Sequence, residues 1–258
     1  MKLNGKVSII TGAGSGIGHG IAKRFVEAGG RVAIADINVD AAEATARELG
    51  DAKTVLGVKM DVSNEADVNA GVDKVAKAFG TVDVAIANAG IQIVHPIEEF
   101  SFNEWKKLLA IHLDGAFLLT KACVKYMYAQ KSGALIYMGS VHSHEASPLK
   151  SAYVTAKHGL LGLARTMAKE GGKHGVRANI ICPGFVRTPL VDKQIPEQAK
   201  ALGISEECVV NEIMLGETVD KQFTRVEDVA EVALMLAAFP TNALTGESIL
   251  VSHGWHMV

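Results

Sequence analysis

The sequence predicts an α/β protein whose core is a parallel sheet of seven strands, doubly wound so that helices cover both faces. Three observations predict this fold class. Short apolar runs recur along the chain with helical patterns between them. A glycine-rich turn follows the first run, and polar residues follow several later ones. The 258 residues contain no proline-rich linker or low-complexity tract, so we expect a single domain spanning residues 1–258.

Each expected strand is a short apolar run bounded by turn residues or polar residues. The runs cover residues 7–11, 32–36, 54–60, 84–88, 134–139, 177–182 and 248–251. The helical patterns between them act as crossovers, which makes the strands parallel. Right-handed crossovers place ligands beyond the carboxyl ends of the strands. The residues expected to converge at that edge are Gly12, Asp36, Asp61, Asn88, Ser140 and Pro183.

A glycine-rich turn, Gly12-Ala-Gly-Ser-Gly-Ile-Gly18, separates the first strand from the first helical pattern. Glycines at 12, 16 and 18 permit a tight turn, close approach of the backbone to a pyrophosphate, and close packing of helix on strand. The helix also offers free N–H groups and its positive dipole end to a phosphate. A flexible loop is the alternative, but the flanking strand and helix favour a Rossmann-type dinucleotide site.

Asp36 ends the second expected strand, where a carboxylate accepts hydrogen bonds from the adenosine ribose hydroxyls. The same charge repels a 2′-phosphate, and Ile37 stands where an NADP site would need a cation. We therefore expect NAD as the cofactor. Asp36 could instead cap the following helix, and the two roles are compatible.

Tyr153 and Lys157 are four residues apart in a segment with a helical pattern. On a helix this spacing puts the phenol and the ammonium on one face, about 6 Å apart along the axis. A cation at about 4 Å, with an effective dielectric constant of about 20, is worth roughly 4 kcal/mol and would bring a phenol pKa from about 10 to about 7. Tyr153 would then act as a base near neutral pH. The alternative is an ordinary exposed pair on a helix.

Composition argues against several classes of partner. The net charge of −2 and the pI near 6.5 lack the positive field that nucleic-acid binding needs. No apolar stretch approaches the length of a membrane span, and residues 1–6 lead into the first strand without a signal-peptide core. We expect a soluble, cytoplasmic protein without membrane contact. Cys123, Cys182 and Cys208 are widely separated and form no Cys-x-x-Cys pair, so neither disulfides nor a metal site is expected.

Several motifs occur together along the chain: Thr11-Gly-Ala-Gly-Ser-Gly-Ile-Gly18, Asp61-Val62, Asn88-Ala-Gly90, Ser140, Tyr153-x-x-x-Lys157 and Pro183-Gly184. Together they resemble the short-chain dehydrogenases/reductases, and the resemblance covers the entire chain. It implies a homotetramer and hydride transfer between a secondary alcohol and a nicotinamide. The cofactor-binding residues that it implies are Gly12, Ser15, Gly16, Ile17, Gly18, Asp36, Asp61, Val62, Asn88, Ala89, Gly90, Tyr153, Lys157, Pro183, Gly184, Val186 and Thr188. Asp61 could instead only cap the next helix, and Asn88 could be only a strand-end turn.

The resemblance also implies catalytic roles. Tyr153 as a phenolate takes the hydroxyl proton, Ser140 hydrogen-bonds the oxygen, and Lys157 lowers the tyrosine pKa while holding the nicotinamide ribose. Ser140 taken alone could be a turn hydroxyl. One position departs from the family pattern: His112 stands where many members carry an asparagine that helps a proton relay. Imidazole can donate and accept hydrogen bonds as an amide does, but a histidine packed in the interior is an equal alternative.

A second group of residues is similar to the substrate-binding set of D-3-hydroxybutyrate dehydrogenases. Its members are Gln92, Ser140, His142, Lys150, Tyr153, Gln194 and Trp255. Lysine, histidine and glutamine side chains donate hydrogen bonds to a carboxylate, and a tryptophan can cover a methyl group. Taken singly, Lys150 and Gln194 read as solvated surface, His142 as a loop polar group, and Trp255 as a residue of a subunit interface.

Residues 188–225 are expected to form a small helical lid that carries Gln194 over the substrate. Pro189, Pro196, Gly203 and Gly216 are expected to break this segment into short helices. The resemblance of the substrate-binding set implies an NAD-dependent enzyme that interconverts D-3-hydroxybutyrate, a small carboxylate, with acetoacetate. The rivals are a related enzyme acting on another secondary alcohol, a polyol or a 3-oxoacyl thioester, and a nucleotide sensor without turnover. A sensor has no physical need for a poised phenolate, which weighs against it.

Overall fold

The computed structural model describes the backbone of residues 1–258 and the side chains of all of them except Leu190. Seven strands form one parallel sheet in the order β3-β2-β1-β4-β5-β6-β7. The chain order reverses at β1 and β4, which defines the switch point of a doubly wound Rossmann-like sheet. The strands are β1 (Val7–Thr11), β2 (Arg31–Asp36), β3 (Val55–Lys59), β4 (Val84–Ala87), β5 (Gly133–Met138), β6 (Val176–Pro183) and β7 (Ser248–Val251).

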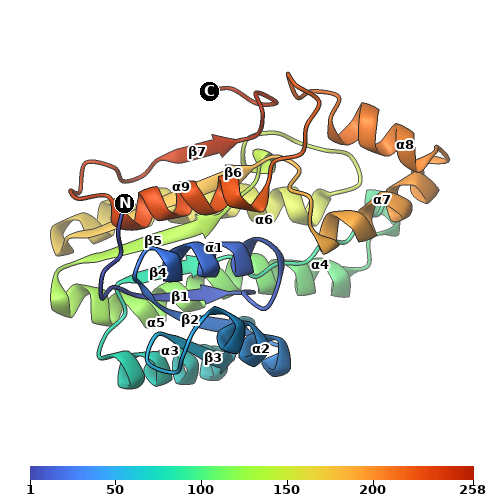
Figure 1. The fold of residues 1–258 in the computed structure, drawn as a ribbon. Helices are drawn as coiled ribbons and strands as arrows, with labels where there is room; N and C mark the ends of the chain where they lie inside the picture. The colour runs from blue at the N-terminus through green and yellow to red at the C-terminus, as the bar shows by residue number, and fades with distance from the viewer.

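Helices cover both faces of the sheet, which confirms the predicted single α/β domain (Figure 1). Helices α1 (Gly16–Glu27), α2 (Val39–Leu49) and α9 (Val226–Ala238) pack on one face. Helices α3 (Glu65–Phe79), α5 (Gly115–Gln130) and α6 (Ser151–Gly171) pack on the other. Successive strand residues point to opposite faces of the sheet. In β1, Ile10 packs in the core on the side of α1, α2 and α9, and Ile9 packs in the core on the side of α3, α5 and α6. All seven predicted strands are present, and their ends differ from the predicted ones by one residue at most.

Capping hydrogen bonds from nearby side chains fix where several helices start, and the residues that make them can be recognised in the sequence. The Asn38 side chain accepts the Ala41 N–H at the start of α2, and Asn64 caps α3 in the same way. Ser101 and Glu104 form a capping box at the start of α4 (Phe102–Leu109). These caps place the strand-to-helix turns, and with them the polar residues, at the carboxyl edge of the sheet.

Helix α4 continues through η2 (Ala110–Asp114), a π-helical turn, into α5. Such turns insert an extra residue into a helix and often occur at functional sites. Here the turn carries His112, whose side chain is buried. The chain also forms short 3₁₀ turns, which are η1 (Ile97–Glu99), η3 (Val141–Ser143) and η4 (Gly172–His174).

The segment predicted as a lid contains α7 (Pro189–Leu202), α8 (Glu206–Cys208) and the π-helical η5 (Val209–Met214). Figure 1 shows α7 and α8 beyond the ends of the strands to which the arrowheads point. One detail of the prediction was wrong: Pro196 lies inside α7 instead of ending it. Pro189 opens the helix, Gly203 ends it at a φ of 67°, and packing of Val191, Ile195 and Ala199 holds the helix together through the proline. None of the described helices has the length and apolar character that crossing a membrane requires.

Candidate active site

A cavity of about 740 Å³ opens at the carboxyl ends of the strands, on the side where the sequence places its polar residues. It extends from the glycine turn after β1, past β4 and β5, to the segment after β6. The structure brings every predicted site residue except Gly18 to the wall of this one cavity. Those residues are Gly12, Ser15, Gly16, Ile17, Asp36, Asp61, Val62, Asn88, Ala89, Gly90, Gln92, His112, Ser140, His142, Lys150, Tyr153, Lys157, Pro183, Gly184, Val186, Thr188, Gln194 and Trp255.

Gly18 lies beneath the wall and acts through packing. A Cβ atom at this position would lie 2.5 Å from the Gly12 carbonyl oxygen and 2.6 Å from the Asn88 amide nitrogen. Gly12 itself has a φ of 63°, and a Cβ there would lie 2.8 Å from the Ala89 Cα. The turn is therefore closed to any larger residue at both positions. The side chain of Ser15, at the N-cap of α1, makes no capping hydrogen bond within the described structure, so first-turn N–H groups can bind a ligand.

Asp36 is half-buried at the end of β2 and belongs to the cavity wall. Its Oδ2 accepts the Gly14 N–H at 3.0 Å and its Oδ1 accepts the Asn38 N–H at 3.0 Å. The helix cap is Asn38, so Asp36 does not itself cap α2. Sequence reasoning missed Gly14: a Cβ there would lie 2.9 Å from the Asp36 Oδ2. Its position inside the glycine-rich turn was the available signal.

Asp61 and Asn88 are both held in place by short local contacts. The Asp61 Oδ1 accepts the N–H of Ser63 at 2.9 Å and its hydroxyl at 2.6 Å, whereas Asn64 caps α3. The Asn88 Nδ2 donates to the carbonyl oxygens of Thr11 at 2.9 Å and Gly12 at 3.2 Å. Asn88 thus ties the end of β4 to the end of β1. Asn88 is more than a strand-end turn, because its amide braces the glycine turn.

Tyr153 and Lys157 project from the first turns of α6 toward Ser140, which follows β5. The Lys157 Nζ lies 5.2 Å from the centre of the Tyr153 ring and donates to the Met138 carbonyl oxygen at 2.6 Å. Lys157 is only 4% exposed and Ser140 only 8%, which removes the alternative of an exposed surface pair. The three side chains therefore line the same part of the cavity.

Burial dominates the protonation of this group. It raises the pKa of Tyr153 to about 12, against a lowering contribution from the hydrogen bond with Ser140. It also lowers the pKa of Lys157 to about 8. The predicted lowering of the Tyr153 pKa by Lys157 is therefore not found in the protein alone. The prediction used the attraction of a nearby cation and left out the cost of moving the phenolate out of water.

His112 faces Tyr153 from the π-helical turn. The two rings meet edge to face with their centres 5.4 Å apart. The His112 Nε2 lies 2.7 Å from the Ile91 carbonyl oxygen and 3.0 Å from the Ile91 N–H donor, while its Nδ1 has no partner among the described residues. Burial, with the charge of Lys157 second, lowers the His112 pKa to about 3, so the ring is neutral. His112 is both packed in the interior and part of the cavity wall.

The residues predicted to bind substrate form the other end of the cavity. Lys150 and Gln194 are 2% and 6% exposed, so the interpretation as solvated surface is wrong for both. Burial lowers the pKa of Lys150 to about 8, and Lys150 forms no ion pair among the described side chains. The Trp255 ring meets His142 edge to face at 5.4 Å. Among the predicted substrate-binding residues, the buried polar atoms without a described partner are Gln92 Oε1, both ring nitrogens of His142 and Gln194 Nε2.

Phe185 is a wall residue that sequence reasoning missed. The Phe185 ring stacks on Trp255 with the ring centres 5.1 Å apart. The same ring also contacts Lys150, whose Nζ lies 5.0 Å from the ring centre. Phe185 stands between Gly184 and Val186, two residues that the family resemblance assigns to the cofactor site. The sequence around Phe185 does not predict the contact with Trp255, which is 70 positions later. The contact depends on how the turn after β7 folds back.

The comparisons with known proteins agree with this geometry. A family model described as short chain dehydrogenase matches residues 6–199. A D-beta-hydroxybutyrate dehydrogenase of Rhizobium meliloti is 39% identical over 97% of this chain and 98% of its own. A D-beta-hydroxybutyrate dehydrogenase of Cupriavidus necator is 35% identical, covering 98% of both chains. A D-threitol dehydrogenase of Mycolicibacterium smegmatis is 34% identical, covering 98% of this chain and 94% of its own. The chain therefore belongs to the short-chain dehydrogenase family and is an oxidoreductase acting on CH–OH groups with a nicotinamide dinucleotide.

Proposed function

We propose that the protein is an NAD-dependent D-3-hydroxybutyrate dehydrogenase, which oxidises that acid reversibly to acetoacetate. The observation that carries the proposal is the buried ammonium of Lys150, which has no carboxylate partner among the described side chains. A buried charge without a counter-ion is costly, and an anionic ligand would compensate it. The names of two relatives, both D-beta-hydroxybutyrate dehydrogenases, support the same substrate.

The described polar groups around Lys150 fit a small carboxylate. Buried polar groups in folded proteins normally have hydrogen-bond partners, so the partnerless atoms of His142 and Gln194 indicate a ligand. A neutral His142 suits this role, because burial lowers its pKa to about 3 and one ring nitrogen remains a donor. Trp255 and Phe185 supply an apolar surface beside these donors for the methyl end of the acid.

The other end of the cavity fits NAD in preference to NADP. The Asp36 carboxylate at the end of β2 would accept hydrogen bonds from the adenosine ribose and repel a 2′-phosphate. Ile37 beside it is 64% exposed and offers no positive charge. The glycine turn and the start of α1 would hold the pyrophosphate, and Asp61, Asn88 and the segment 183–188 complete the predicted set. NAD⁺ supplies the hydride acceptor and a positive charge on its nicotinamide ring.

Catalysis by the chain itself centres on Tyr153. Its phenolic oxygen accepts the hydroxyl proton of the alcohol while Ser140 hydrogen-bonds the same substrate oxygen. A pKa near 12 is too high for a base at neutral pH, so the phenolate requires positive charge close by. Lys157 contributes one charge at 5.2 Å from the ring, and we propose that it also holds the nicotinamide ribose. His112 stays neutral and contacts the Tyr153 ring, and its Nδ1, which has no described partner, is placed to hold by a hydrogen bond a water molecule that carries the proton away.

The segment 188–225 is proposed to close over the substrate as a lid. Its apolar residues form a cluster of their own, apart from the two sheet cores, so the segment can shift without breaking either core. Its contributions to the cavity wall are Thr188, Pro189, Val191 and Gln194. The homotetramer and the cytoplasmic location stay predictions of the family resemblance and the composition.

The test is a substrate panel followed by the absorbance of reduced nicotinamide. It contains D-3-hydroxybutyrate, its L enantiomer, D-threitol and an uncharged secondary alcohol, each with NAD and with NADP. We expect turnover of the D acid with NAD and little turnover of the others. Activity confined to D-threitol or uncharged alcohols would replace the assignment by that of another family member. Nucleotide binding without turnover of any alcohol would favour the sensor.

A further inference from the structure

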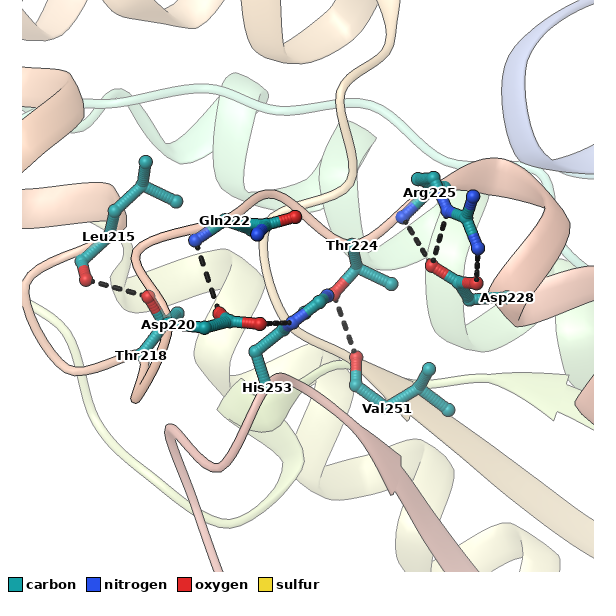
Figure 2. A network of polar contacts seen from close by, with 9 residues as sticks. All are labelled: Leu215, Thr218, Asp220, Gln222, Thr224, Arg225, Asp228, Val251 and His253. Atoms are coloured by element: carbon teal, nitrogen blue, oxygen red, sulfur yellow. Dashed lines mark hydrogen bonds and ion pairs between the residues drawn. The ribbon is translucent and has the colours of Figure 1, made fainter.

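The turn that carries Trp255 is tied to the base of the lid by two residues outside the cavity. Asp220 lies between η5 and α9, and His253 lies just after β7. Figure 2 shows the two side chains pointing toward one another, and the His253 Nδ1 is 2.8 Å from the Asp220 Oδ2. This hydrogen bond is the largest cause of the lowered pKa of the Asp220 carboxyl. The contact joins segments 33 residues apart in the chain.

The backbone joins the same two segments. The Val219 N–H donates to the His253 carbonyl oxygen at 2.9 Å. A Cβ atom on Gly254 would lie 2.9 Å from the Val219 Cγ1, so the two turns are in close contact. Nearby, the Thr224 hydroxyl donates to the Val251 carbonyl oxygen at 3.1 Å (Figure 2). These contacts surround the Asp220–His253 pair.

Both turns hold a residue in a conformation that side chains rarely adopt. His253 has a φ of 51° and Lys221 a φ of 56°. The Trp255 N–H donates to the Ser252 carbonyl oxygen at 3.0 Å, so residues 252–255 form a β-turn whose two central residues, His253 and Gly254, are left-handed. Glycine is the ordinary residue for such a position. Histidine is one of the few other residues enriched in this conformation, and here its side chain is held by the Asp220 carboxylate.

We propose that Asp220 and His253 are positioning residues that hold Trp255 over the substrate end of the cavity. Trp255 is the second residue after His253, and its ring contacts His142 and Phe185. On the far side of the tryptophan, His256 pairs with Glu145, so the segment is anchored at both ends. The Asp220–His253 contact fixes the turn and thereby the angle at which the indole enters the cavity. The inference rests on the proposed function only in the use of Trp255 as a substrate contact.

Kinetics of Asp220 variants test this inference. Trp255 would bind ground state and transition state alike, so Asp220→Ala should raise the KM for D-3-hydroxybutyrate about two- to fivefold and change kcat less. Asp220→Asn keeps an acceptor for the histidine N–H and should recover part of the loss. The matched control is Glu217→Ala, which removes the same charge from an exposed residue of the same segment that has no described ion pair. A KM for Asp220→Ala equal to that of the control, or a loss confined to kcat, would overturn the inference.

Fluorescence gives a second readout that does not depend on the substrate assignment. The chain has two tryptophans, so Trp105→Phe leaves Trp255 as the only one. In that background Asp220→Ala should increase quenching of Trp255 by acrylamide, and Glu217→Ala should not. His253→Gly should match Asp220→Ala, and the double variant should be no worse than either single one, because the two share one interaction. Equal quenching in all five proteins, the Trp105→Phe background included, would reject the positioning role even if no substrate of the panel were turned over.

Discussion

The two ends of the cavity are built differently. At the cofactor end, the polar groups are satisfied by the chain itself: Asp36 accepts backbone N–H groups of Gly14 and Asn38, and the Asn88 amide donates to the backbone of β1 and the glycine turn. At the substrate end, His142 and Gln194 have buried polar atoms without described partners, and Lys150 has no described counter-ion. The cofactor end is therefore preorganised, whereas the substrate end has buried polar groups that a ligand would pair.

This difference has a physical consequence for recognition. The hydrogen bonds of Asp36 and Asn88 join turns that the paired strands β2, β1 and β4 hold side by side, so the cofactor end is shaped without a ligand. The substrate end is assembled from residues of distant segments whose polar groups become satisfied when the anion binds. We therefore expect changes at the two ends to act on different ligands, and Tyr153 between them to act on the chemical step.

The largest effect is expected where the two ends meet. Tyr153→Phe keeps the ring and its packing but removes the group that accepts the proton, so kcat should fall about 10²- to 10⁴-fold. The dissociation constant for NADH and the KM for the acid should change little. Turnover close to that of the wild type would mean that another group accepts the proton and that Tyr153 does not act on the chemical step.

The next effect concerns the substrate end alone. Lys150→Met removes the ammonium from its buried place, and a competitive short carboxylate should bind about 10- to 150-fold more weakly at pH 7, as for loss of a hydrogen bond to a charged group. Affinity for NADH should be unchanged. An equal loss of NADH affinity would contradict the expectation that the two ends of the cavity act on different ligands.

The same lysine predicts a pH dependence. Its pKa is lowered to about 8, so the ammonium is charged below this pH and neutral above it. The inhibition constant of the carboxylate should therefore be flat below pH 8 and rise above it, about tenfold per pH unit. Lys157 has a similar pKa, and Lys150→Met separates the two, because in that variant the rise should disappear. A rise that persists in the variant would assign it to Lys157.

A smaller effect is expected at the cofactor end. Asp36→Ala removes one charged acceptor that is half exposed to solvent, so the KM for NAD should rise about tenfold. Repulsion of a 2′-phosphate is lost at the same time, and the ratio of NADP to NAD activity should increase. The KM for the acid is the internal control and should stay constant. An unchanged cofactor preference would show that Asp36 is only a brace for the glycine turn.

The smallest effect is expected at His112. His112→Asn restores the residue that the resemblance places in other family members, and its amide can donate to the Ile91 carbonyl oxygen; turnover should stay within about threefold of the wild type. His112→Ala should lose more, because no donor remains. Since burial lowers the His112 pKa to about 3, neither variant should move the pH profile of turnover above pH 5. A variant that does so would show that the ring is charged during the reaction.

Much of the fold and of the cofactor end could be predicted because the signals are local. Apolar runs bounded by turn or polar residues predicted the seven strands. The spacing of Gly12, Gly16 and Gly18 predicted the turn around the phosphate site. Pro196 was misjudged because intrinsic helix preference is a weak guide once Ile195 and Ala199 are packed on both sides of the proline. The pKa of Tyr153 was misjudged because burial cannot be counted from spacing.

The sequence alone determined the family, the seven-stranded parallel sheet, and the edge at which the polar residues meet, because periodicity, turn chemistry and capping act over a few neighbouring residues. Only the tertiary structure decided the depth of Lys150 and Gln194, the stacking of Phe185 on Trp255 and the pairing of Asp220 with His253. Those properties arise when segments far apart in the chain are packed together and exclude water. No local pattern in the sequence records that packing.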